Sequence, residues 1–136
     1  MDITGKKVLL LDDEFYFGEI LQIGFARLGC ELVHFVRVRV EGDNVILMNP
    51  TGKETRLNQG DFDFALLDGR IKGGNMNGWD ITPYMVRLGL PVVAMSGADS
   101  LNEQMLQAGA TTAVRKDLLW GKLRDGSFEL VLARPT

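Results

Sequence analysis

Five polar residues stand at the ends of apolar runs, and their side chains are of the kinds that handle divalent cations and phosphate. Asp12 and Asp13 follow KVLLL, and Asp68 ends FALLD. Ser96 ends PVVAMS, and Lys116 ends AVRK. Mg²⁺ prefers carboxylate oxygens and often shares its site with phosphate oxygens, and a carboxylate can itself form an aspartyl phosphate. If the fold brings these groups together, they suit phosphoryl chemistry.

The apolar runs before these residues are predicted to be strands. They are short and mostly lack polar alternation, as strands do when a parallel sheet is covered on both faces. Segments with helical spacing of apolar residues lie between several of them, and such alternation predicts a parallel α/β sheet. The predicted strands are residues 7–11, 31–35, 62–68, 91–96 and 113–116.

Capping residues predict where the helices begin and end. The first helix carries an apolar stripe and is expected to stop at Gly29. A weaker helix is expected over 80–88, with Thr82 as its N-cap and Pro83 at its first helical position.

The two remaining helices are predicted nearer the end of the chain. One runs over about 100–108, where Ser100 and Glu103 match a capping box. A final helix is expected over 127–134. Residues 118–126 are then an extra stretch between the last strand and that helix.

Residues 36–57 break the alternation of strands and helices. Val36, Val38 and Val40 recur at period two, and the turn sequences EGDN and NPTG follow. This pattern predicts an antiparallel hairpin or meander where a second helix would be expected.

The predicted sheet places the five polar residues at one edge, because ligands bind at the carboxyl ends of the strands in an open α/β sheet. Carboxylates crowded there repel one another by about 4 kcal/mol per pair at about 4 Å and an effective dielectric of about 20. A divalent cation, Mg²⁺ in particular, would offset that repulsion.

Composition bounds the function further. The 136 residues fit a single domain, residues 1–136, and the net charge of −3 argues against nucleic-acid or membrane partners. No apolar run reaches the roughly 20 residues of a membrane span, and the N-terminus does not match a signal peptide. The single cysteine, Cys30, excludes an internal disulfide. A cytoplasmic location is expected.

In order along the chain, several short motifs resemble the receiver domain of two-component response regulators. They are VLLLDDE at 8–14, ALLD at 65–68, NGWD at 77–80, VVAMSG at 92–97 and RKD at 115–117. The resemblance implies a flavodoxin-like, doubly wound five-stranded parallel sheet of order 2-1-3-4-5, here with the insertion at 36–57. It also implies a stand-alone switch that receives a phosphoryl group from a histidine kinase or a histidine phosphotransfer protein and then acts on a downstream protein.

The same resemblance implies a role for each site residue. Asp68 would accept the phosphoryl group, Lys116 would pair with it, and Ser96 would move towards it on activation. The magnesium ligands would be Asp13, Asp12 through water, Asp68, and the backbone carbonyl of Arg70. The protein would not be an enzyme beyond accepting and losing its own phosphoryl group.

Three departures from the receiver pattern leave alternatives open. The loop after Asp68 lacks the usual proline, and Gly78 comes ten residues after the acceptor rather than eight. Asp117 replaces a cis-proline, and Ala113 stands where a switch aromatic is usual. These changes favour a second hypothesis, a binding module that signals without phosphorylation. A phosphatase with an aspartyl intermediate is a third, which Arg70, in place of a second acid, disfavours.

Single residues also allow structural interpretations. Asp12, Asp13 and Glu14 could simply begin the first helix, where negative charge is favourable. His34 is most simply a structural or surface residue, and Cys30 a small buried apolar one.

Overall fold

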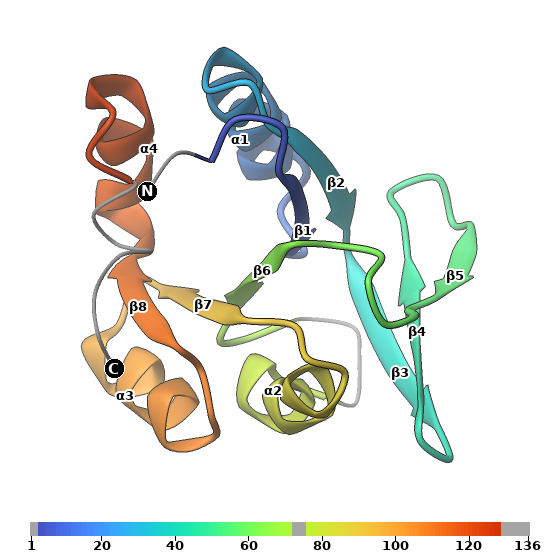
Figure 1. Ribbon diagram of the computed structural model, residues 1–136. Coiled ribbons are helices and arrows are strands. Elements are labelled where there is room, and N and C mark those ends of the chain that lie inside the picture. Colours follow the sequence, from blue (N-terminus) through green and yellow to red (C-terminus); the bar gives the residue numbers. More distant parts are fainter. Residues whose placement is uncertain (1–2, 72–75, 129–136) are drawn as a thin grey trace.

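The computed structural model describes residues 3–71 and 76–128, and a five-stranded parallel sheet forms its centre (Figure 1). The spatial order is β2-β1-β6-β7-β8. Counted within this sheet alone, the order is 2-1-3-4-5, so the predicted topology is confirmed. The strands are β1 (Lys7–Leu11), β2 (Glu31–Phe35), β6 (Phe64–Asp68), β7 (Val92–Ser96) and β8 (Thr112–Arg115).

The sheet is covered on both faces, which explains its apolar runs. All five residues of β6 and of β7 are buried, whichever way their side chains point. One face carries α1 (Phe15–Arg27) and α4 (Lys116–Asp125), and the other carries α2 (Gly78–Arg87) and α3 (Asp99–Gln107) (Figure 1). None of the helices described is long and apolar enough to cross a membrane.

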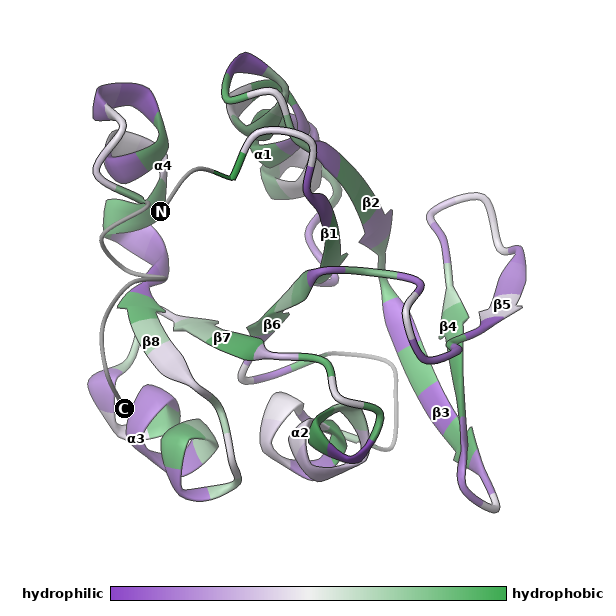
Figure 2. Cartoon of the chain, viewed as in Figure 1, coloured by the Kyte–Doolittle hydropathy of each residue, from purple (hydrophilic) through white to green (hydrophobic). Residues whose placement is uncertain are grey.

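The predicted insertion is a separate three-stranded antiparallel sheet, order β3-β4-β5. Its strands are β3 (Arg37–Glu41), β4 (Asn44–Met48) and β5 (Glu54–Arg56), and we call residues 36–57 the meander. Figure 2 shows β3 alternating between polar and apolar residues, unlike β6 and β7. Its buried side chains, Val38, Val45 and Leu47, join the core cluster that contains α2 and α3 residues. The meander therefore covers the sheet as a helix would.

The start of α2 differs from the prediction. The helix begins at Gly78, so the predicted N-cap at Thr82 and first-turn position of Pro83 are wrong. Asn77 caps it instead, and its N–H donates to the Asp80 carboxylate at 2.9 Å. Thr82 lies inside the helix, where its hydroxyl donates to the Gly78 carbonyl at 2.7 Å. The Asn77–Asp80 capping pair therefore sets the start of α2, one turn before Thr82.

Two further predictions at the C-terminal side are corrected. Helix α3 begins at Asp99 after an Ala98 cap, so Ser100 lies inside it and the predicted capping box is wrong. Residues 118–126 are not an extra stretch, because α4 starts directly after β8 and runs to Asp125, and Gly126 ends it with φ 81°. The helix predicted over 127–134 falls, beyond residue 128, outside the described residues.

The packing of the meander can be tested by comparing its two faces. Leu47 is 1% exposed, whereas the neighbouring Ile46 points the other way and is only half-buried. Leu47→Ala should lower the free energy of unfolding by about 2–5 kcal/mol through transfer and cavity terms. Ile46→Ala should cost clearly less. Urea denaturation measures both, and equal losses would mean that the meander does not pack through this face.

Candidate functional site

The acids that follow β1 and end β6 meet at the carboxyl edge of the sheet. β1 and β6 are parallel neighbours, with Leu11 opposite Leu67, so Asp12 and Asp68 emerge side by side. One carboxylate oxygen from each of Asp12, Asp13 and Asp68 can be chosen so that all lie within 4.8 Å of one another. Three anionic ligands at that separation are spaced as a single cation would need them.

Lys116 brings a positive charge to this cluster from the start of α4. Its Nζ lies 2.7 Å from Asp12 Oδ2, 3.4 Å from Asp68 Oδ2 and 3.6 Å from Glu14 Oε1. The same ammonium lies 4.6 Å from the centre of the Phe17 ring. Burial lowers the pKa of Lys116, but the close ion pair with Asp12 and the charges of Asp68 and Glu14 more than offset this, so the pKa is raised and the lysine is charged.

Asp12 is fully buried and only partly satisfied. Its Oδ1 accepts the Glu14 N–H at 2.8 Å. Its Oδ2 faces the Lys116 ammonium but accepts no well-aligned hydrogen bond from the described residues. Burial, together with the Glu14 charge, raises the pKa of Asp12 despite the lysine. An oxygen with unused lone pairs at the edge of an acidic cluster fits a metal ligand or a ligand to metal-bound water.

Asp68 is the second acid of the cluster whose negative charge is disfavoured by its surroundings. Burial, and then the charge of Asp12, raises its pKa to about 6, against the opposing effect of Lys116. Asp12 and Asp68 therefore share the Lys116 ammonium with Glu14, and a divalent cation would neutralise further negative charge of the cluster. The residues present fit Mg²⁺, which takes one or two carboxylates and keeps several waters.

Ser96 lies beside the end of β6. It is 3% exposed and follows Met95, which stands opposite Asp68 in the β6–β7 register. Its hydroxyl accepts the Ala98 N–H at 3.3 Å. A Cβ on Gly69 would lie 3.6 Å from Ser96 Cβ, an ordinary contact, and 3.3 Å from Leu101 Cβ, a tight one.

The long loop after Asp68 returns against it. The Gly78 N–H donates to the Gly69 carbonyl at 2.9 Å. A Cβ at position 78 would lie 2.2 Å from the Asp68 carbonyl oxygen, so only glycine permits this approach. The Arg70 guanidinium lies over the Trp79 ring at 5.9 Å. The role predicted for the Arg70 carbonyl stays a prediction, and residues 72–75 lie outside the described part.

The departures from the receiver pattern have local consequences. Ala113 stands opposite Ala94 in β8, so no aromatic side chain is available at that position. The peptide bond before Asp117 is trans, like every other described peptide bond. Asp117 instead accepts hydrogen bonds from the Arg115 guanidinium at 3.1 and 3.4 Å, in the first turn of α4.

Sequence reasoning missed two residues that touch the cluster. Glu14 was weighed only as a helix-start residue, yet it approaches Lys116. His34 was taken as structural or superficial, yet its Nε2 lies 2.7 Å from the Asp12 carbonyl oxygen and the residue is 6% exposed. The available signal was its position near the end of β2, which is the neighbour of β1 in the predicted order.

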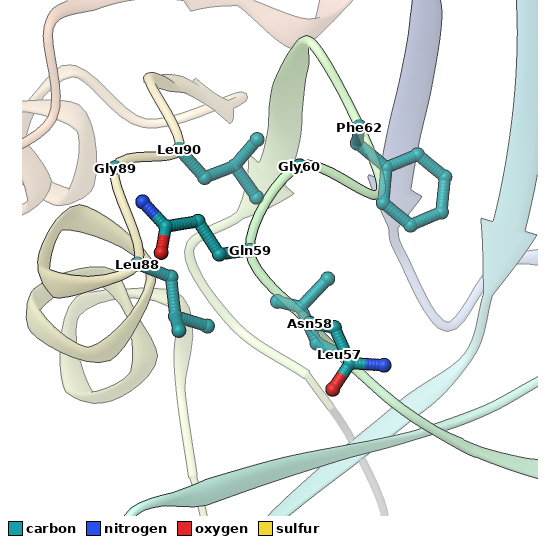
Figure 3. Close-up of a pocket in the computed structure, with 8 residues that line it drawn as sticks. All are labelled: Leu57, Asn58, Gln59, Gly60, Phe62, Leu88, Gly89 and Leu90. Carbon is teal, nitrogen blue, oxygen red and sulfur yellow. The ribbon is translucent and has the colours of Figure 1, made fainter.

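A second cavity lies at the opposite edge of the sheet, before β6 and β7 (Figure 3). No ionisable side chain lines it, so it offers no comparable chemistry. Its lining residues are Leu57, Asn58, Gln59, Gly60, Phe62, Leu88, Gly89 and Leu90.

Comparison with known proteins finds likeness at the level of structure. No family model matches the sequence, and no curated protein does. A two-component response regulator from Clostridium difficile aligns at TM-score 0.64 and 15% identity, over 95% of this chain and 97% of that one. The receiver domain of NtrX from Brucella abortus aligns at 0.64 and 15%, over 93% and 99%; in the longer NtrX structure this chain covers only 27%.

A third structure is the receiver domain of a sensor histidine kinase from Pseudomonas aeruginosa, with a magnesium ion in its active site cleft. It aligns at TM-score 0.65 and 15% identity, over 96% of this chain and all of that one. At such low identities the likeness extends to the fold. Over nearly its whole length, this chain has the fold of response regulator receiver domains.

Proposed function

We propose that the protein is a receiver domain that accepts a phosphoryl group on Asp68 in a Mg²⁺-dependent reaction. The observation that carries this is the meeting of Asp68 with Asp12, Asp13 and Lys116 at one sheet edge. The fold supports the proposal, because the matched receiver domains share it. Receiver domains are generally signalling modules, so no separate small-molecule substrate is expected.

In the proposed step, an oxygen of the ionised Asp68 carboxylate attacks phosphorus and forms a P–O bond. The bond from phosphorus to the donor breaks, and the donor leaves with its electron pair: an imidazole nitrogen if the donor is a phosphohistidine. Lys116, within 3.4 Å of Asp68, pairs with an oxygen of the transferring group. Asp12 and Asp13, with Asp68 and the Arg70 carbonyl, would hold Mg²⁺, which neutralises charge on those oxygens.

Partners follow from this chemistry. The donor would be a histidine kinase or a histidine phosphotransfer protein, and the readout a downstream protein. A phosphoryl group on Asp68 adds charge and strong acceptors beside Ser96, which can bias a two-state surface. The usual aromatic switch is absent because position 113 is alanine, so the signal would leave the site by another route.

A binding module that works without phosphorylation is the second candidate. Ala113 and the trans bond before Asp117 favour it, since both differ from the receiver pattern. The retention of every charged group of the site favours phosphorylation instead, because a binding module has no need to bury Asp12 and Asp68 beside Lys116.

Labelling of Asp68 is the direct test. Incubation with Mg²⁺ and a small acyl phosphate should add the mass of one phosphoryl group, located on Asp68 by mass spectrometry after trapping. Asp68→Asn should abolish the label, because an amide oxygen is a poor nucleophile, whereas Asp43→Asn, in the exposed hairpin turn, should leave it intact. Labelling that survives in Asp68→Asn would remove the acceptor assignment, and no labelling of the wild type would leave the binding module.

Metal binding separates the roles of two neighbouring acids. Asp13→Asn should weaken Mg²⁺ binding at least about tenfold, about 1.4 kcal/mol, because it removes a ligand. Glu14→Gln removes the same charge one residue away but lies outside the three-carboxylate cluster, so its effect should be much smaller. Calorimetry, or the emission of Trp79 beside the loop, reports the affinity. Equal effects would mean that only net charge matters.

The buried carboxyl of Asp68 should also leave a mark on stability. Its folded pKa of about 6 lies above the ordinary 3.8, so its ionisation destabilises the fold increasingly as pH rises from about 4 to 6. Asp68→Asn should therefore raise the free energy of unfolding in the absence of Mg²⁺ by about 2–3 kcal/mol above pH 6. That gain should vanish near pH 4. Urea denaturation across pH measures it, and a gain independent of pH would refute the assigned cause.

A further inference from the structure

The chain has one histidine, and it is buried against the backbone of the candidate site. The His34 Nε2 lies 2.7 Å from the main-chain carbonyl oxygen of Asp12. Because a carbonyl can only accept a hydrogen bond, Nε2 carries the proton and donates. No step of the proposed phosphoryl transfer uses this side chain.

The hydrogen bond replaces one that the sheet would otherwise make. The parallel ladder continues one residue past Leu11, because the Asp12 N–H donates to the Phe35 carbonyl at 3.0 Å. In a continued ladder the Asp12 carbonyl would accept the N–H of Arg37. The chain instead leaves for the meander: Val36 N–H donates to Met48 O at 2.8 Å, and Arg37 begins β3. His34 supplies the donor that the insertion takes away.

The fold makes room for the imidazole in this place. A Cβ on Gly18 would lie 2.2 Å from His34 Nδ1, so any side chain at position 18 would collide with the ring. The Phe15 ring meets the imidazole edge-on, with 6.5 Å between ring centres. The ring is therefore held between α1 and the end of β1, aimed at the Asp12 carbonyl.

From this geometry we propose that His34 is a positioning residue of the cation site. Its Nε2–H fixes the Asp12 carbonyl, and with it the two consecutive acids that leave β1. The role as a support of Mg²⁺ ligands rests on the proposed function; the anchoring of Asp12 does not. An apolar residue at position 34 fills the same space without a donor, and glutamine keeps an N–H donor at similar reach.

The first measurement is the Mg²⁺ affinity of four variants. His34→Leu should weaken binding about tenfold, in the range seen for outer-shell partners of metal ligands. Gly18→Ala should weaken it similarly by displacing the ring, although alanine normally favours a helix. His34→Gln should stay close to wild type. Phe15→Leu, which alters packing beside the ring but removes no donor, should also stay close to wild type. Unchanged affinity in His34→Leu overturns the inference.

The second measurement needs no metal. The Glu14 N–H donates to Asp12 Oδ1, so its hydrogen exchange reports whether Asp12 is held in place. In the metal-free protein His34→Leu should accelerate this exchange about tenfold, and His34→Gln should not. Equal acceleration at Leu21, further along α1, would mean general loosening of the helix and would overturn the inference. If the wild type binds no Mg²⁺, the proposed function fails, while the exchange result still decides the role of His34.

Discussion

The structure depends on one electrostatic constraint: Asp12 and Asp68 are buried side by side, and the Lys116 ammonium contacts both. Burial disfavours the charge on each acid. The charge of Asp12 also raises the pKa of Asp68, and the charge of Glu14 raises the pKa of Asp12. Lys116 offsets part of that cost from 2.7 and 3.4 Å. Such an arrangement is poor for stability and is found where charge is needed for chemistry. The parallel sheet brings these charges together, because β1, β6 and β8 all end at the same edge.

The insertion shows how a sheet face can be covered by something other than a helix. A crossover between parallel strands usually contains a helix, but here the meander supplies the apolar face. Val38, Val45 and Leu47 alternate with exposed or half-buried residues and enter the same core as Met85 of α2. The fold requires a buried apolar surface of the right place and size, and either a helix or a small sheet can provide it.

Strand burial could be predicted from the sequence because it follows from apolar runs, whereas the strand order was implied by the resemblance to receiver domains. KVLLL and FALLD predict covered strands, and the acids after them predict a shared edge. Helix starts were harder to predict. Asn77, Thr82 and Ser100 are all residue types that cap helices, but the backbone places only Asn77 directly before a helix. Residues 118–126 were predicted as an extra stretch because the final helix was expected over 127–134, yet Leu119 and Leu123 have helical spacing and are buried.

The contact between His34 and Asp12 could not have been predicted from local pattern at all. It requires knowing that the ladder continues one residue past Leu11 through the Asp12 N–H while the chain leaves β2 after Phe35, which depends on the register and on where the meander departs. Gly18, three residues into the first helix, would have been judged only by its low helix propensity. In the fold, Gly18 has no side chain where the His34 imidazole lies, and so leaves room for the ring. Two residues, His34 and Gly18, thus connect the insertion with the acidic site. Because the chain leaves β2 for the meander, the Asp12 carbonyl loses a backbone N–H donor, and the His34 ring, in the space left by Gly18, donates to it instead.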